Sequence, residues 1–400
     1  MAGTPTFSFS TVNAFVLGKH HLLPSTRSPD VIQIIRDTAG LHATSGTTPY
    51  LSLLARSPGV RPKALGEQLE RRTLAKIRCV RGTIYIQPRD WIPAFIAATR
   101  RRNIAQTAEY ARREGISERR YSAITSEITA LLAGTSLTAA AIRKALGFKG
   151  DVSAVLYRMC DEALLLRDRP EKGWRDRILG YSLFREAFPD VDLEAIDEPT
   201  AMRSIVEQYL RCFGPATEAD VVWWTGFSKA EVRKALEALG RRLVPVALGD
   251  ERRTALLLRE ELASLETFEH PKGPVVSLLP TLDGYLMGYR DRERYLRPEL
   301  AGMVFDRSGN VTSTILADGV IVGVWDWEEG PESLVKLHYL SSVSEGIRNA
   351  AMRQGIEMGR FLFGREAEVG FCESMGPLSQ RPAGSVMAPL KGIDAVKRAG

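Results

Sequence analysis

The segment TEADVVWWTGFSKAE, residues 217–231, contains two helix starts separated by a single glycine. Thr217 and Ser228 occupy N-cap positions, each ahead of an apolar stretch, and Gly226 interrupts the chain between them. We therefore expect a short helix ending near Trp224, a tight turn, and a second helix. Two helices joined in this way are typical of a helix-turn-helix unit.

The sequence on either side extends this unit to a winged helix. A helix over 201–213 precedes it and stops at a Gly-Pro pair, and strands over 243–248 and 254–258 follow it around a Gly-Asp-Glu turn. Helix, turn, helix and hairpin together make a winged helix, whose second helix can enter the major groove of DNA.

The same order of elements occurs twice earlier in the chain. In the first copy we expect a helix capped by Asp30, helices over 48–56 and 62–74, and a hairpin over 75–86. In the second we expect a helix over 139–146 capped by Thr138, a helix over 151–163, and a hairpin over 164–181 whose return strand begins at 174. The sequence thus predicts three tandem winged-helix units.

After Pro271 the pattern changes to short strands and loops, followed by an amphipathic helix over 344–363. The predicted strands are 275–279, 302–305, 311–316, 319–327 and 334–340. We expect an α+β fold, with the three winged-helix units followed by a small β-barrel-like domain closed by the helix. The expected domain boundaries are 1–100, 101–190, 191–270 and 271–400.

Composition indicates a globular protein. The 400 residues carry a formal charge of +6 with a pI near 9.1. No apolar run reaches the roughly 18 residues of a spanning helix, and the N-terminus has no signal-peptide pattern. The four cysteines are scattered, with no histidine at ligand spacing, so we expect no metal and no cofactor. We expect a cytoplasmic monomer, associated with the nucleoid when bound to DNA.

Several segments carry a resemblance to a known family. They are AGLHAT at 39–44, LSLLAR at 51–56, RCVRGTIY at 78–85, DVVWWTG at 220–226, LLPTLDGYLMGYRDR at 278–292, and ADG at 317–319 leading to GVW at 323–325. In this order they cover nearly the whole chain, which resembles the winged-helix DNA glycosylases of the azinomycin-resistance type. That family comprises bacterial alkylpurine and interstrand-crosslink glycosylases.

The resemblance implies excision of N-alkylated purines, of the N7-alkylguanine or N3-alkyladenine type, from double-stranded DNA by water attack at C1′. Bulky genotoxin adducts and crosslinks belong to the implied substrates. The family's catalytic motif, Gln-x-Gln or Gln-x-Asp, aligns with His42-Ala43-Thr44, so both polar positions differ here. Tyr85 stands where the family often has a histidine. The matched motifs contain no lysine positioned as an amine nucleophile, so we expect a monofunctional enzyme.

His42 and Thr44 are the predicted catalytic residues. An alkylated purine already carries positive charge and leaves readily, so the remaining task is to place a water beneath C1′ and stabilise a cationic sugar. A neutral His42 with a pKa near the operating pH could accept a proton from that water, which the Thr44 hydroxyl would help to hold. Protonated His42 would repel the sugar cation, so activity should fall at low pH. The alternative is that His42 is simply packed.

Aspartates in the C-terminal motifs are candidates for catalytic support. Asp283 and Asp318, together with Asp291, could face the sugar or the water. The alternative is that these aspartates cap turns and pair with Arg290 or Arg292.

Basic residues in the first hairpin and in the 278–292 motif are expected to hold DNA phosphates without reading sequence. The predicted contacts are Lys76, Arg78, Arg81, Arg290 and Arg292. The adjacent Trp223 and Trp224 are expected to pack in the core.

Two other functions fit the same pattern. A non-catalytic winged-helix protein that binds DNA, as a regulator or a lesion-binding factor, would keep the basic surface without base release. A protein-interaction scaffold would show no salt-dependent DNA binding.

Overall fold

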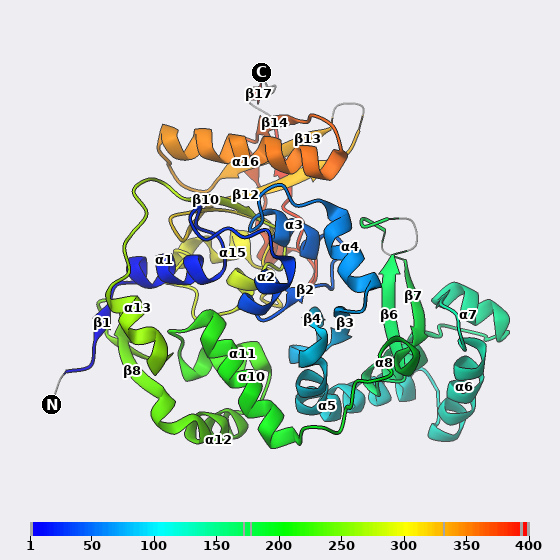
Figure 1. Cartoon of the computed structure of the whole chain (residues 1–400). Coiled ribbons are helices and arrows are strands. Elements are labelled where there is room, and N and C mark those ends of the chain that lie inside the picture. The colour runs from blue at the N-terminus through cyan, green and yellow to red at the C-terminus, as the bar shows by residue number, and fades with distance from the viewer. Residues whose placement is uncertain (1–2, 171–172, 177, 331–332, 393–394, 398–400) are drawn as a thin grey trace.

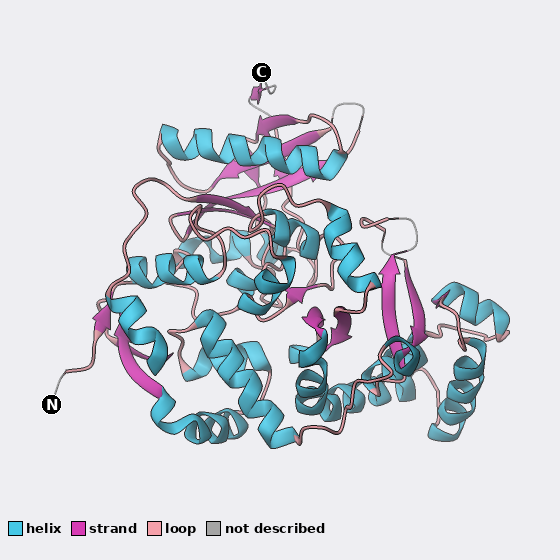
Figure 2. Cartoon of the chain, viewed as in Figure 1, coloured by secondary structure: helices cyan, strands magenta, loops and turns pink. Residues whose placement is uncertain are grey.

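The computed structural model describes residues 3–170, 173–176, 178–330, 333–392 and 395–397. Helices and small sheets alternate along the chain in a mixed α+β arrangement (Figure 2). No helix in the described ranges combines the length and the apolar character needed to cross a membrane.

The first group of elements surrounds the AGLHAT segment. It comprises the helices α2 (Val31–Asp37), α3 (Thr48–Leu54) and α4 (Pro62–Glu70), and a sheet with the order β2 (Leu41–His42), β4 (Ile84–Pro88), β3 (Leu74–Arg78). Asp30 caps α2 as predicted, because its carboxylate accepts the N–H groups of Ile32 and Gln33 at 2.9 and 3.0 Å.

The second group lies at one end of the molecule, on the right in Figure 1. It comprises α6 (Glu118–Leu131), α7 (Ala139–Ala145) and α8 (Ser153–Asp161), and a sheet with the order β5 (Leu137–Thr138), β7 (Leu179–Leu183), β6 (Leu165–Pro170). The predicted start of the return strand at 174 is wrong. Trp174 instead packs against Tyr50 and Phe361, with ring centroids 5.0 and 5.3 Å apart, and pairing begins at Leu179. Part of the hairpin tip, 171–172, lies outside the described residues.

The third group agrees most closely with its prediction. It comprises α10 (Glu198–Phe213), α11 (Glu218–Thr225) and α12 (Lys229–Leu239), and a sheet with the order β1 (Thr6–Phe7), β8 (Leu243–Leu248), β9 (Arg253–Leu258). Thr217 and Ser228 each form a capping box with the acid three residues later, and Gly226 adopts the left-handed conformation at φ 70°. The parallel pairing of β1 with β8 was not predicted.

Three of the longer described helices were not predicted. They are α1 (Phe9–Lys19), α5 (Ile92–Arg113) and α6 of the second group. The helix α5 runs for 22 residues and contacts both α8 and α10, so it joins the second and third groups. Pro93 in its first turn is a helix-start signal that the sequence analysis did not use, and no side-chain cap accompanies it.

The C-terminal region forms a six-stranded sheet beneath the helix α16 (Glu345–Phe363), at the top of Figure 1. The strand order is β10 (Val276–Leu279), β11 (Thr314–Ala317), β12 (Val320–Glu328), β13 (Leu334–Tyr339), β14 (Glu368–Phe371), β17 (Ala395–Lys397). Two further short strands, β15 (Ser374–Met375) and β16 (Leu390–Lys391), pair with each other.

Two expectations for this region are wrong. The sheet is open, with β10 and β17 at its edges, and is not a closed barrel. Its apolar residues are covered by Met358 and Leu362 of α16 and by Leu51 and Leu54 of α3, so closure is not needed to bury them. The predicted strand 302–305 is instead the short helix α15 (Ala301–Val304), because a short apolar run does not distinguish helix from strand.

The largest core cluster draws residues from widely separated parts of the chain. Val16 of α1, Tyr209 of α10, and Tyr285 and Tyr289 around the helix α14 (Gly284–Met287) are buried together. The Tyr209 hydroxyl donates to the carbonyl of Gly288 at 2.9 Å. The DGYLMGY segment is therefore packed against the third group and lies close to the AGLHAT turn.

Candidate active site

The turn before β2 fixes the position of the HAT motif. Ala39 and Gly40 have φ values of 55° and 100°, and the Gln87 side chain donates to the Ala39 carbonyl at 3.1 Å. A Cβ on Gly40 would lie 2.4 Å from Gln87 Nε2, so a larger residue does not fit. This tight turn directs the chain from α2 straight into His42.

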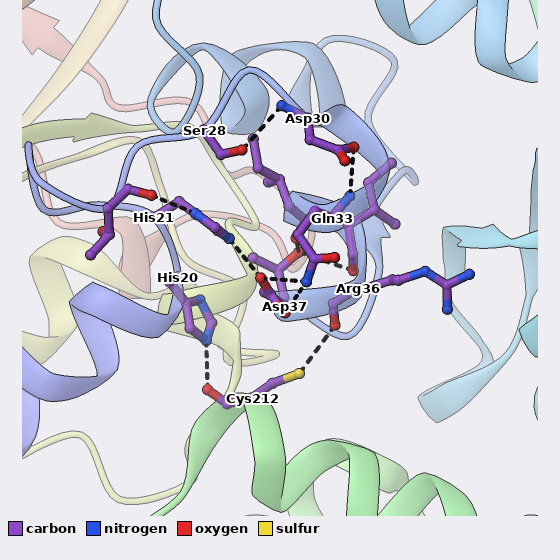
Figure 3. A network of polar contacts seen from close by, with 12 residues as sticks. His20, His21, Ser28, Asp30, Gln33, Arg36, Asp37 and Cys212 are labelled. Atoms are coloured by element: carbon purple, nitrogen blue, oxygen red, sulfur yellow. Dashed lines mark hydrogen bonds and ion pairs between the residues drawn. The ribbon is translucent and has the colours of Figure 1, made fainter. Parts of the chain in front are cut away.

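A polar network holds α2 against α1 and α10 (Figure 3). His21 Nε2 lies 2.7 Å from an Asp37 carboxylate oxygen, and the Cys212 thiol donates to the Arg36 carbonyl at 3.3 Å. His20 Nε2 lies 3.1 Å from the Cys212 carbonyl, and burial lowers the pKa of this imidazole well below its ordinary value. The helix that precedes the HAT motif is therefore tied to the rest of the molecule at its C-terminal end.

His42 lies at the end of β2 and is only 5% exposed. It pairs with Tyr85 of β4, and the two rings meet edge to face with centroids 5.1 Å apart. Its Nδ1 is buried without a hydrogen-bond partner among the described residues. Burial, with a smaller contribution from the nearby Arg81 charge, lowers the pKa of His42 to about 4 despite the opposing effect of Asp283. The imidazole is therefore neutral at physiological pH.

This pKa differs from the sequence expectation of a value near the operating pH. The difference has a simple cause, since sequence reasoning took the ordinary value for an exposed histidine and the side chain is buried. A neutral His42 can still accept a hydrogen bond from water, but it holds a transferred proton poorly.

Thr44, two residues later, is exposed. Its hydroxyl accepts the N–H of Ile84 at a long 3.4 Å, and the residue lines a cavity of about 790 Å³. The HAT motif therefore spans the boundary between a buried imidazole and an open cavity.

Arg81 and Arg292 lie over the same indole ring. The guanidinium carbons of Arg81 and Arg292 are 4.0 and 5.6 Å from the Trp223 ring centroid, and Arg292 also lies 3.5 Å above Phe305. Burial lowers the pKa of both guanidinium groups, although both stay charged. Arg292 Nε and Trp223 Nε1 are buried without a hydrogen-bond partner in the described part of the chain.

The expectation that both tryptophans pack in the core holds for Trp224, which is buried, but not for Trp223, which is half-buried between the two arginines. Adjacent helical residues point about a quarter-turn apart or more, so the two rings cannot share one environment. Trp223 is thus a site residue that the sequence analysis missed, and the signal was its place in the matched DVVWWTG segment.

The three aspartates are all engaged in structural contacts. Asp283 receives two hydrogen bonds from Arg56, both at 2.8 Å, and a third from Ser52 at 2.7 Å. Asp318 accepts the N–H of Val275 at 2.8 Å in the turn between β11 and β12. Asp291 pairs with Arg253. Of the three, Asp283 is close enough to His42 to influence its pKa.

Lys76 and Arg78 face away from His42. Residues paired across neighbouring strands point to the same face, so Ile77, Tyr85 and His42 share one face of the sheet. Lys76 and Arg78 alternate with Ile77 and point to the other.

Lys76 is buried and Arg78 is already paired, so neither is free to bind a phosphate, whereas Arg290 is exposed. Lys76 is buried, which lowers its pKa to about 8. Arg78 Nη1 forms an ion pair with Asp161 at 2.6 Å, and its Nη2 donates to Gln106 at 2.7 Å. Arg290 is exposed. Among the predicted DNA contacts, only Arg81 and Arg292 are brought together around one ring.

Comparisons with known proteins agree with this architecture. The family model described as DNA glycosylase AlkZ-like matches residues 35–361. An interstrand DNA cross-link repair glycosylase of Streptomyces sahachiroi is 23% identical over 343 residues, which cover 80% of this chain and 88% of that protein. The solved structure of the Streptomyces sahachiroi DNA glycosylase AlkZ has a TM-score of 0.74 at 20% identity, over 92% of this chain and all of that one.

The structural similarity establishes a shared fold, and the family model spans most of the chain, including the HAT motif. The resemblance seen in the sequence is thereby confirmed: the chain belongs to the AlkZ-like family of DNA glycosylases.

Proposed function

We propose that the protein is a monofunctional DNA glycosylase that releases N7-alkylguanine and N3-alkyladenine from double-stranded DNA. Bulky genotoxin adducts and crosslinks are included in the proposed substrates, since the Streptomyces sahachiroi relative is named for interstrand crosslink repair. The observation that carries the proposal is the burial of His42, which the sequence resemblance aligns with the family's catalytic glutamine. Its imidazole is neutral, and its Nδ1 has no hydrogen-bond partner among the described residues.

In the proposed reaction a water oxygen attacks C1′ of the damaged nucleotide while the bond from C1′ to the purine nitrogen breaks. The bonding electrons pass to the purine, where they neutralise the positive charge that alkylation created. The neutral imidazole of His42 accepts a hydrogen bond from the attacking water at a ring nitrogen and so orients it, as a family glutamine would. Because the pKa of His42 is about 4, the proton released by the water passes on to solvent.

The absence of a lyase step is supported by the position of Lys76. This lysine of the first hairpin is buried and points to the sheet face opposite His42, so its amine does not approach a sugar held at His42. Water is then the nucleophile, and the product is an abasic site.

DNA binding is assigned to the surface around Trp223. Arg81 and Arg292 carry charge beside this ring, and Arg290 is exposed in the same segment as Arg292. These side chains would hold phosphates on either side of the lesion, in any sequence context. We propose that the three groups of helices and hairpins act as winged-helix units of one monomer, with the first and third facing DNA.

The test is single-turnover release of 7-methylguanine from a methylated duplex, followed by chromatography of the free base. The proposal predicts free 7-methylguanine and strand breaks that appear only after alkali treatment. Breaks without alkali would show a lyase step. Tight binding of the duplex with no base release would instead identify a lesion-binding protein without chemistry.

A further inference from the structure

An open cavity lies beside Thr44, so its lining reaches the HAT motif. Its volume is about 790 Å³, within the range of roughly 300–1,000 Å³ that small-molecule sites occupy. One wall is the first hairpin with Arg78 and Ile84, and the opposite wall belongs to α5 and the second group. Nothing in the proposed hydrolysis of a small methylated base uses this space.

Tyrosine rings line the cavity. Tyr110 of α5 and Tyr157 of α8 are stacked with centroids 6.5 Å apart, and Tyr181 of β7 also contributes to the lining. Tyr157 is 38% exposed and belongs to the cavity lining. Exposed aromatic rings bind other planar groups by stacking.

Two arginines belong to the cavity lining, and both already interact with other side chains. Arg78 is neutralised by Asp161 at 2.6 Å, and the same aspartate acts on the buried Arg167. The guanidinium carbon of Arg167 lies 5.4 Å from the Tyr157 ring centroid, so this charge is directed toward an aromatic face. With both guanidinium groups already engaged, the tyrosine rings of the lining remain available to stack on a planar group.

We propose that this cavity accommodates the aromatic portion of a bulky adduct, carried by a purine bound at the HAT motif. The geometry connects the two places, because Thr44 belongs to the motif and also lines the cavity. A group attached to the purine could pass Thr44 and stack between the first hairpin and Tyr157. This inference rests on the proposed function and adds a determinant of substrate size to it.

Ala140 offers a way to fill the cavity. It lies on α7, is exposed and lines the cavity, so Ala140→Trp occupies the space without disturbing buried packing. Ala123→Trp on α6 is the matched control, since Ala123 is exposed in the same group of helices and is not part of the lining. Tyr157→Ala removes the aromatic wall in a second, independent way.

The experiment compares two duplexes, one with 7-methylguanine and one with an N7-guanine adduct of an aflatoxin epoxide, a neutral polycyclic group. Single-turnover release and equilibrium binding by fluorescence anisotropy are measured on both. We expect Ala140→Trp and Tyr157→Ala to slow release of the polycyclic adduct, and to weaken its binding relative to 7-methylguanine, by about tenfold or more. Release of 7-methylguanine should change less than about twofold, and Ala123→Trp should change neither.

Equal losses on both duplexes, or no loss on either, would overturn the cavity assignment. So would a wild-type protein that releases 7-methylguanine but neither binds nor releases the polycyclic adduct. If the wild type releases neither base, the proposed hydrolysis is wrong. The binding preference for the polycyclic adduct over 7-methylguanine then still tests whether the cavity holds the adduct. Loss of that preference in the two cavity variants supports the assignment, and its retention contradicts it.

Discussion

Arg56 and Asp283 form a bidentate ion pair that is almost completely buried, with side-chain exposed fractions of 1% and 0%. The two guanidinium nitrogens donate to the two carboxylate oxygens at 2.8 Å each, and Arg56 also donates to the Ser52 carbonyl at 2.9 Å. The pair joins the LSLLAR segment of α3 to the DGYLMGY segment before α14. Two motifs far apart in the sequence thus meet through this pair, and Asp283 is close enough to His42 to influence its pKa.

Removing one member of this pair should destabilise the fold. Asp283→Ala leaves the Arg56 charge buried without a partner, so we expect a loss of about 3–5 kcal/mol in the free energy of unfolding by urea. The double variant Arg56→Met with Asp283→Leu should recover a large part of this loss, because no unpaired charge remains. A loss below about 1 kcal/mol for the single variant would show that the pair is not structural. A stable Asp283→Ala protein without base release would place Asp283 in the chemistry.

Burial of a neutral His42 should make stability depend on pH. The folded pKa of about 4 lies below the ordinary value of about 6.5, so the stabilisation is present above pH 6.5 and is lost as the pH falls toward 4. The loss amounts to about 3 kcal/mol. Urea unfolding at pH 7.5 and pH 4 should therefore show a smaller difference for His42→Gln than for the wild type. If the free energy of unfolding changed equally between the two pH values in both proteins, the pKa of His42 would be the same in the folded and the unfolded chain.

The same pKa sets the pH profile of base release. Neutral His42 should support release unchanged from pH 8 down to about pH 5, and the rate should fall only near pH 4. Single-turnover rates across this range measure the profile. A fall centred near pH 6.5 that is absent in His42→Gln would contradict the buried, neutral histidine.

His21 should have the opposite pH dependence. Burial alone would lower its pKa, but the hydrogen bonds with Asp37 and the Thr26 carbonyl outweigh this effect and raise it. The stabilisation is thus complete below about pH 6.5 and is lost as the pH rises through the raised pKa. Asp37→Asn should cost about 1 kcal/mol at pH 6 and less at pH 9, as measured by urea unfolding. An equal cost at both pH values would show that protonation of His21 plays no part.

Arg81 and Arg292 should contribute to DNA affinity without sequence preference. Arg81→Gln and Arg292→Gln should each weaken binding of undamaged duplexes of any sequence, and each should reduce the slope of log K against log salt by about 1. Arg242→Gln is the control, because Arg242 is exposed, is paired with Glu207 and is not one of the two arginines that lie over the Trp223 ring. Fluorescence anisotropy at several salt concentrations gives the slopes. Unchanged slopes in both variants would show that the surface around Trp223 does not contact DNA.

Local signals in the sequence predicted much of the fold. The caps at Thr217, Ser228 and Asp30 depend only on residues within one helical turn, so they can be recognised from the sequence alone. The helix α5 has Pro93 in its first turn but no side-chain cap, and its packing against α8 and α10 involves residues far along the chain, which no local pattern records. The open form of the C-terminal sheet was not predicted for a similar reason, because the helices that cover it, α3 and α16, come from distant parts of the chain.

The candidate site was only partly predictable. His42 and Thr44 were found by resemblance, but the burial that lowers the pKa of His42 depends on folding, which packs its ring against Tyr85 of β4. The cavity beside Thr44 could not be predicted, since Tyr110, Tyr157 and Tyr181 come together only after folding.

The most direct test of the account compares single-turnover release of 7-methylguanine by the wild type, His42→Ala and His42→Gln, with folding checked by urea unfolding. If His42 orients the attacking water, His42→Ala should lose about 100-fold or more in rate, while His42→Gln, which restores the family residue, should retain most of it. Equal rates for the wild type and a folded His42→Ala protein would contradict the account.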